Sequence, residues 1–160
     1  MSQRTEALIA ETRRYLGVVE TPKNSNRGLC IDYWIREAGL DPAGAFPWCA
    51  AFVGQMGRQA VGASWPVPRT ASVAAIAAWA ATHDVLWDRP MAGDLFILWN
   101  HRLRRFAHVG VVTEVDLATD SYRTIEGNTN GGGSRDGFGV FARARSLDDK
   151  TKFVRWEAAQ

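Results

Sequence analysis

The spacing of apolar residues along the chain changes once, near Asp94. Before this point, apolar residues recur at the three- and four-residue intervals of a helix face, and glycine or proline separates the segments. The pattern predicts helices over about residues 8–16, 29–38, 47–60 and 71–82. We expect Pro47 in the first turn of the third helix, and Thr70 or Ser72 as the cap of the fourth.

After Asp94, the apolar positions alternate or run continuously, as they do in strands. The predicted strands are Leu95–Trp99, Ala107–Val115, Tyr122–Glu126, Val140–Arg145 and Phe153–Trp156. Helices followed by strands, with polar or glycine-rich turns between them, favour an α+β fold over alternating βαβ units. We therefore expect one domain over residues 1–160, with N-terminal helices packed on an antiparallel sheet.

Composition narrows the class of protein. Hydrophobic residues make up 46% of the 160 residues and charged residues 22%, as in ordinary globular domains. The formal net charge of +2 does not indicate nucleic acid as a partner. The longest apolar stretch, Val73–Ala81, is less than half of a membrane span, so we expect no membrane insertion. Charged residues between Arg4 and Arg14 leave no room for the apolar core of a signal peptide, which predicts synthesis in the cytoplasm without one.

The chain has two cysteines, too few for a disulfide framework. Cys49 lies at the expected start of the third helix, where unpaired N–H groups and the helix dipole favour a negative charge. A thiolate is the nucleophilic form of cysteine, so this position suits a nucleophile. Because free cysteines are also common in protein cores, the position alone leaves both interpretations open. Cys30 has apolar neighbours and no histidine nearby, and we expect it in the core.

Three histidines could supply a base for a cysteine nucleophile. His83 ends a helix and His101 lies in an arginine-rich turn, so both are expected at the surface. His108 lies inside a predicted strand, and alternation places it on the same face as Gly110. The missing side chain of Gly110 leaves space on that face for another group. A neutral imidazole can exchange a proton with a thiol near pH 7.

The next predicted strand ends with Glu126, which shares a face with Tyr122 and Thr124. If this strand pairs antiparallel with the strand of His108, the carboxylate can reach the imidazole ring. Taken alone, Glu126 would be interpreted as a solvated strand end. The order of cysteine, histidine and acceptor is typical of thiol triads in which a third group orients the base.

Four segments together resemble the CHAP family, the cysteine, histidine-dependent amidohydrolases/peptidases of the papain-like NlpC/P60 group. They are Trp48–Val53, Gly93–Phe96, Ala107–Val112 and Ile125–Asn128. The resemblance extends from about Asn24 to Arg145. It implies a papain-like α+β fold and a hydrolase that cleaves an amide bond in the peptide part of bacterial peptidoglycan.

The resemblance also implies roles for individual residues. Cys49 corresponds to the nucleophile, His108 to the base, Glu126 to the group that orients the base, and Asn128 to a further polar site position. Neighbourhood along the chain adds candidate substrate-binding residues, which are Trp48, Trp99, Asn100 and Asn130. The arginine-rich turn, with Arg102, Arg104 and Arg105, either faces solvent or contacts carboxylates of the stem peptide.

Two properties of many relatives are not expected in this chain. Several phage lysins of the family bind calcium through an aspartate-rich loop ahead of the nucleophile. Here that region holds only Asp32 and Asp41, far apart, so we predict no metal and no cofactor. Many relatives also carry a wall-binding module, for which we expect no room in 160 residues.

The resemblance leaves the biological setting open. Without a signal peptide, a wall hydrolase would be a phage endolysin released by lysis or an antibacterial effector delivered by a secretion system. An effector would have an immunity protein as a partner. The bond would be the N-acetylmuramoyl–L-alanine amide or a peptide bond. The alternatives are an intracellular cysteine-dependent amidohydrolase or transacylase acting on small amides or protein side chains, and a non-catalytic binding domain with the same fold.

Overall fold

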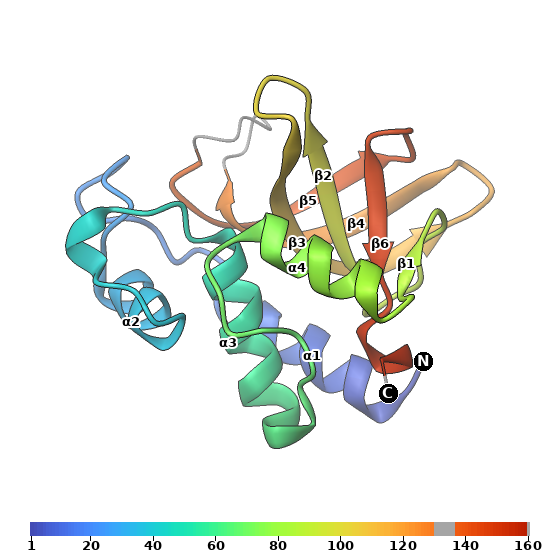
Figure 1. The fold of residues 1–160 in the computed structure, drawn as a ribbon, viewed down its shortest axis with the longest axis horizontal. Coiled ribbons are helices and arrows are strands. Elements are labelled where there is room, and N and C mark those ends of the chain that lie inside the picture. The colour runs from blue at the N-terminus through green and yellow to red at the C-terminus, as the bar shows by residue number, and fades with distance from the viewer. Residues whose placement is uncertain (130–136, 160) are drawn as a thin grey trace.

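A computed structural model describes residues 1–129 and 137–159 of the chain. Within these ranges, helices fill the first half and an antiparallel six-stranded sheet the second half, which confirms the predicted α+β class (Figure 1). The helices are α1 (Gln3–Arg13), α2 (Leu29–Glu37), α3 (Cys49–Val61) and α4 (Val73–Thr82). The strands are β1 (Leu86–Trp87), β2 (Leu95–Asn100), β3 (Arg105–Asp116), β4 (Ser121–Thr129), β5 (Gly139–Ser146) and β6 (Thr151–Val154). Short 3-10 helices cover Pro42–Gly44, Gly62–Ser64 and Trp156–Ala158.

The helix starts follow local capping chemistry. Ser72 caps α4, and its hydroxyl accepts a hydrogen bond from the backbone N–H of Ala75 at 3.2 Å. Helix α3 begins two residues later than the position of Pro47 predicts, because Trp48 has a non-helical backbone and takes the N-cap position. Cys49 is therefore the first residue of α3, as the sequence indicates.

The strands lie in the order β1-β6-β2-β3-β4-β5. The last strand, β6, thus inserts between β1 and β2 rather than extending the edge beyond β5. Strand β1 was not predicted, since two residues are too few to show a period. The predicted strand Phe153–Trp156 ends at Val154, and Trp156 begins the final 3-10 helix.

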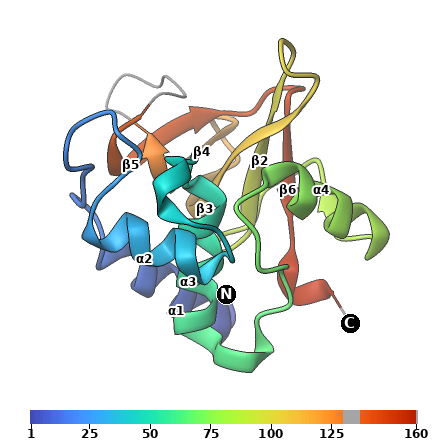
Figure 2. The same ribbon diagram turned by 60° about the vertical axis from the view of Figure 1, so that its left-hand side comes forward.

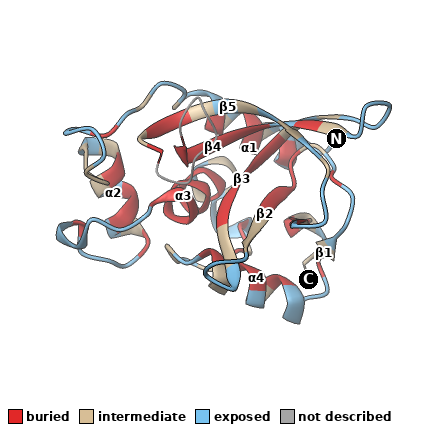
Figure 3. Cartoon of the chain, turned by 90° about the horizontal axis from the view of Figure 1, so that it is seen from above, coloured by how far each residue is buried: buried red, intermediate tan, exposed pale blue. Residues whose placement is uncertain are grey.

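Helices cover one face of the sheet. Helix α3 packs against β3 and β4, α1 packs on α3, and α4 packs on β3. Figure 2 shows α1, α2 and α3 gathered together and α4 standing apart from them. Buried residues are concentrated in α3 and the central strands (Figure 3). In the described ranges, we find no helix with both the length and the apolar character needed to cross a bilayer.

Residues on the two faces of the sheet belong to two different clusters. Val109, Val111 and Ile125 point toward the helices and join the main core. On the opposite face, Val112 and Tyr122 join a smaller cluster with Phe96 and Phe153. This assignment confirms the alternation predicted for β3 and places His108 and Gly110 on the face of the smaller cluster.

Candidate active site

Cys49 is held in place by the packing of the residue before it. The indole of Trp48 is fully buried against Trp34 and Phe52, at ring-centroid distances of 5.5 Å and 6.4 Å. Its Nε1–H donates a hydrogen bond to Oε1 of Glu20 at 2.9 Å. This corrects the prediction that Trp48 binds substrate, because a side chain with no exposed surface cannot contact a ligand.

Two glycines allow the elements of the site to approach one another. A Cβ at Gly127 would lie 2.6 Å from the ring of Trp48, so glycine lets β4 come close to the start of α3. A Cβ at Gly110 would lie 2.7 Å from the ring of Phe96 and 2.8 Å from Cγ of Glu126. The space that the sequence predicts beside His108 therefore exists, and the side chain of Glu126 occupies part of it.

His108 and Glu126 form a buried pair. Nε2 of His108 lies 2.7 Å from Oε2 of Glu126, and the two side chains are 8% and 0% exposed. Cys49 also interacts with this imidazole ring, and because Nε2 faces Glu126, Nδ1 is the nitrogen left for it. The interpretation of Glu126 as a solvated strand end is therefore wrong.

The electrostatics of this pair favour the charged forms. Burial lowers the pKa of His108, but its interactions with Cys49 and Glu126 outweigh burial and raise the pKa to about 9. Burial likewise raises the pKa of Glu126, whereas Arg145 and His108 lower it to about 2. At neutral pH the site thus holds an imidazolium beside Cys49 and a carboxylate behind it. An adjacent imidazolium stabilises the thiolate form of a cysteine.

The sequence did not reveal that Arg145 and Thr124 belong to this site. Arg145 donates two hydrogen bonds to Glu126, from Nε at 2.6 Å and from Nη2 at 2.7 Å. The hydroxyl of Thr124 donates a third, at 2.5 Å. A signal was present in the order Phe141-Ala142-Arg143-Ala144-Arg145, in which the alanines are exposed and the larger residues half-buried. The register pairs Tyr122 with Arg145, which places the arginine on the face of Glu126.

A groove of about 650 Å³ opens at Cys49 and His108. Asn128 also lines it, so the structure brings together three of the predicted site residues at one surface. Asn128 has φ of 55° where the β4–β5 register shifts, a backbone conformation uncommon outside glycine and often found at functional sites. Glu126 lies behind His108 and is not part of the groove wall.

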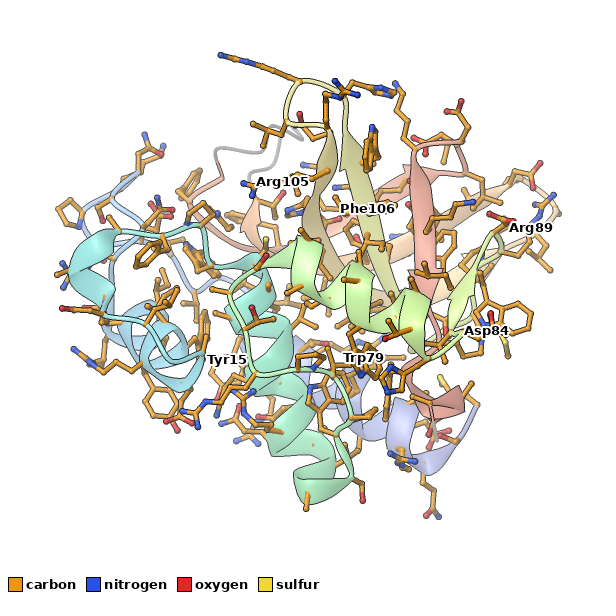
Figure 4. The ribbon with its side chains drawn as sticks, in the orientation of Figure 1. Tyr15, Trp79, Asp84, Arg89, Arg105 and Phe106 are labelled. Carbon is orange, nitrogen blue, oxygen red and sulfur yellow. The ribbon has the colours of Figure 1, made fainter. Side chains whose placement is uncertain are left out.

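A β-bulge beside His108 determines which residues of β3 face the groove. Leu98 pairs with His108, but the next pair is Trp99 with Phe106, so Ala107 has no partner on β2. Four consecutive residues, 105 to 108, line the groove on the two sides of this bulge. Figure 4 shows Arg105 and Phe106 at the upper end of β3, above α4.

Two further predicted contacts do not lie in the groove. Trp99 packs edge-on against Phe106, at a centroid distance of 5.2 Å, and is not part of the groove wall. Asn100 closes the following turn by accepting a hydrogen bond from the backbone N–H of Leu103 at 2.9 Å. Local packing and turn formation use these two side chains, and their contact with substrate stays a prediction. The predicted contact at Asn130 lies outside the described residues.

Within residues 1–129 and 137–159, no group of three or more His, Cys, Asp or Glu side chains is placed to hold a metal ion. The two aspartates ahead of Cys49 have structural contacts instead. Asp32 accepts hydrogen bonds from Arg27 at 2.9 Å, and Asp41 accepts one from the backbone N–H of Ala43 at 2.9 Å.

Comparisons with known proteins identify the family and the fold. The family model of the CHAP domain matches residues 41–128, a range that includes Cys49, His108, Glu126 and Asn128. A solved structure titled "The crystal structure of Ly7917" aligns with 96% of this chain, at a TM-score of 0.51 and 17% sequence identity. At that identity the likeness concerns the fold alone, and this chain spans 62% of that protein's length. No curated protein matches the chain.

Proposed function

Because the chain belongs to the CHAP family, whose model matches more than half of it, we propose that it is a peptidoglycan hydrolase. It cleaves an amide bond in the peptide part of the bacterial cell wall by a thiol mechanism. The observation that supports this proposal is the row of Cys49, His108 and Glu126, of which the first two open onto the groove.

In the proposed mechanism, the Cys49 thiolate attacks the carbonyl carbon of the scissile amide. The N–H groups of the first turn of α3 have no partners within the helix, so they can donate hydrogen bonds to the oxyanion. The imidazolium of His108 then protonates the leaving amine, and water hydrolyses the thioester with the neutral imidazole as base. Glu126 orients the ring throughout and stabilises its charged form.

The groove wall favours a peptide with free carboxylates as the substrate. The guanidinium of Arg105 is exposed, and nothing in residues 1–129 and 137–159 pairs with it. Arg69 also lines the groove but is partly engaged, because it donates to the backbone carbonyl of Glu37. Amide groups of Asn24, Asn26 and Asn128 add hydrogen-bonding capacity for a peptide backbone. Stem peptides of the cell wall present both amide groups and carboxylates.

The test is mass spectrometry of purified sacculi digested with the parent protein, with Cys49→Ala and with Cys30→Ala. Cys30→Ala is the matched control, since Cys30 is half-buried on α2 and lies outside the groove. We expect soluble fragments from the parent and from Cys30→Ala, and a loss on the order of 10⁴-fold or more with Cys49→Ala. The fragment masses identify the bond.

Equal digestion by Cys49→Ala and the parent would overturn the assignment of the nucleophile. No fragments from sacculi of several chemotypes would overturn the substrate. In that case, iodoacetamide labelling of Cys49 separates the two alternatives. Rapid labelling favours an amidohydrolase or transacylase for small amides, and absent labelling favours a non-catalytic binding domain.

A further inference from the structure

We propose that Arg145 is a positioning residue that holds Glu126 in the orientation and charge state that His108 requires. The site is then a row of four residues on four elements, from Cys49 on α3 through His108 on β3 and Glu126 on β4 to Arg145 on β5. The inference rests on the proposed function for its catalytic readout, and its geometry is independent of the substrate.

The contact between Arg145 and Glu126 is bidentate (two-pronged), and it is largely shielded from solvent. Each carboxylate oxygen of Glu126 accepts one N–H of the guanidinium, at 2.6 Å and 2.7 Å. The remaining acceptor sites face Thr124 and His108. Glu126 is fully buried, while the Arg145 side chain is 19% exposed and its guanidinium lies 4.8 Å from the ring centroid of Phe96.

A carboxylate in this position needs a cation. Burial favours the neutral acid, and a protonated Glu126 would be a poorer acceptor for the imidazolium. The titratable groups that face Glu126 in the described part of the chain are His108 from β3, Arg145 from β5 and Tyr122 from β4. Asp148 acts on Arg145 from beyond β5. Of these groups, Arg145 carries a charge that does not titrate, because guanidinium stays protonated throughout the working range.

Arg145 acts through Glu126 and not on the substrate, because it is not part of the groove wall. Its loss should therefore change the chemical step and the pH dependence, and leave substrate binding as it is. Without Arg145, Glu126 takes up a proton at higher pH, and the imidazolium of His108 loses its counter-charge. The reactive thiolate–imidazolium pair then forms only at higher pH. The acid limb, which is the pH range over which reactivity falls as the pH is lowered, therefore moves to higher pH.

The experiment compares Arg145→Met, Arg145→Lys and the matched control Arg123→Met. Arg123 lies on β4 with a side chain that is 70% exposed, and its contact is with Glu114, outside the site. Each variant is tested for cooperative thermal unfolding. Hydrolysis of sacculi gives kcat and KM against pH, and iodoacetamide labelling of the Cys49 peptide, resolved from the Cys30 peptide by mass, gives thiol reactivity against pH.

For Arg145→Met, we expect the acid limbs of labelling and of kcat to rise by roughly one pH unit or more. At neutral pH, kcat should fall on the order of 10²-fold with KM unchanged. Arg145→Lys keeps the positive charge but cannot donate two parallel hydrogen bonds to Glu126. Its acid limb should therefore stay near that of the parent, while kcat falls about tenfold. Arg123→Met should match the parent in every readout. A purely structural role would reduce the folded fraction and leave the acid limb of the folded molecules in place.

Parental kcat and parental acid limb in folded Arg145→Met would overturn the proposal. If Arg145→Met does not fold, Arg145→Lys decides, since a parental kcat there shows that the two-pronged contact is dispensable. Failure of the proposed function is separable from failure of this inference. A shifted acid limb of Cys49 labelling without wall digestion supports the role of Arg145 and overturns the proposed substrate. Wall digestion that is unaffected by the Arg145 variants supports the proposed substrate and overturns the role of Arg145.

Discussion

On β3 and β4, neighbouring residues point to opposite faces of the sheet, and the two faces are lined by different kinds of side chain. Toward the helices, Val109, Val111 and Ile125 are 0–2% exposed and contact other apolar groups. On the other face, His108 and Glu126, counted as whole residues, are 6% and 0% exposed. The residues on the two faces are buried to nearly the same degree, but those on the first face are apolar and those on the second carry charge.

The difference shows what burial of charge requires. An apolar side chain on the first face needs only matching shape, because its transfer from water is favourable by itself. A charged side chain on the second face needs a partner of opposite charge and an occupied hydrogen-bonding site for each lone pair or proton. Each charge there is matched by a group on the next element, so a substitution at one position affects the whole row.

The strongest test of this comparison uses two adjacent residues of β4. Glu126→Gln places an amide nitrogen where donors from Arg145, Thr124 or His108 already point, and leaves the largely enclosed guanidinium of Arg145 without a carboxylate. We expect the free energy of unfolding to fall by about 3–5 kcal/mol and kcat to fall on the order of 10²-fold. Urea unfolding and sacculus digestion measure the two quantities.

Ile125→Val is the matched control on the face that packs against the helices. It removes one methylene from the core and should lower the free energy of unfolding by about 0.5–1.5 kcal/mol with no change in kcat. Equal stability losses from Glu126→Gln and Ile125→Val would contradict the distinction between the faces.

The alkaline limit of activity provides the next test. Burial lowers the pKa of His108, and Cys49 and Glu126 together raise it to about 9. Below that pH the ring keeps the proton that the leaving amine requires, and above it the proton is lost, so kcat/KM should decline as pH rises through about 9. The rate profile and NMR titration of the His108 ring measure this limit. His83→Gln, at an exposed helix end, should leave the profile unchanged. An alkaline limb near the ordinary histidine value of 6.5 would show that the pair is not formed.

The smallest expected effect is that of a substitution at Arg105, at the end of β3 that borders the groove. Arg105→Met should raise KM roughly fivefold, the equivalent of about 1 kcal/mol, for stem peptides with free carboxylates. Peptides whose carboxylates are amidated should show no such increase. Arg102→Met, in the turn just before β3 and outside the groove wall, is the control. Equal effects on both kinds of peptide would remove carboxylate recognition from the role of Arg105.

The parts of the molecule that depend on local signals could be predicted from the sequence. The period of apolar residues located the helices and the longer strands, although α1 covers Gln3–Arg13 and not residues 8–16. The helix start and strand alternation singled out Cys49 and His108. Arg145 escaped prediction because its contact with Glu126 depends on the β4–β5 register, which pairs Glu126 with Phe141 and Arg145 with Tyr122. Sequence spacing does not specify a diagonal contact of that kind.

Other predictions assigned function to aromatic and amide side chains by their proximity in the chain, and for Trp48 the prediction is wrong. Trp48 lies next to Cys49 in the chain. Adjacent residues at a helix start point in different directions, however, and the indole of Trp48 is buried in the core. Trp99 packs on Phe106 and Asn100 closes the turn before β3, and neither is part of the groove wall. The groove wall is assembled from loops and helix ends whose positions depend on the complete fold.

The bulge at Ala107 separates two tasks along one strand. From His108 onward, β3 is tied to the core through its register with β2 and β4, so its residues change only at a cost to folding. Before Ala107, Phe106 and Arg105 still pair with β2, but they also line the groove, and Arg105 is exposed next to a turn. Under the proposed function, a substitution of the exposed Arg105 should therefore change substrate preference while the pairing of His108 with Leu98 is retained.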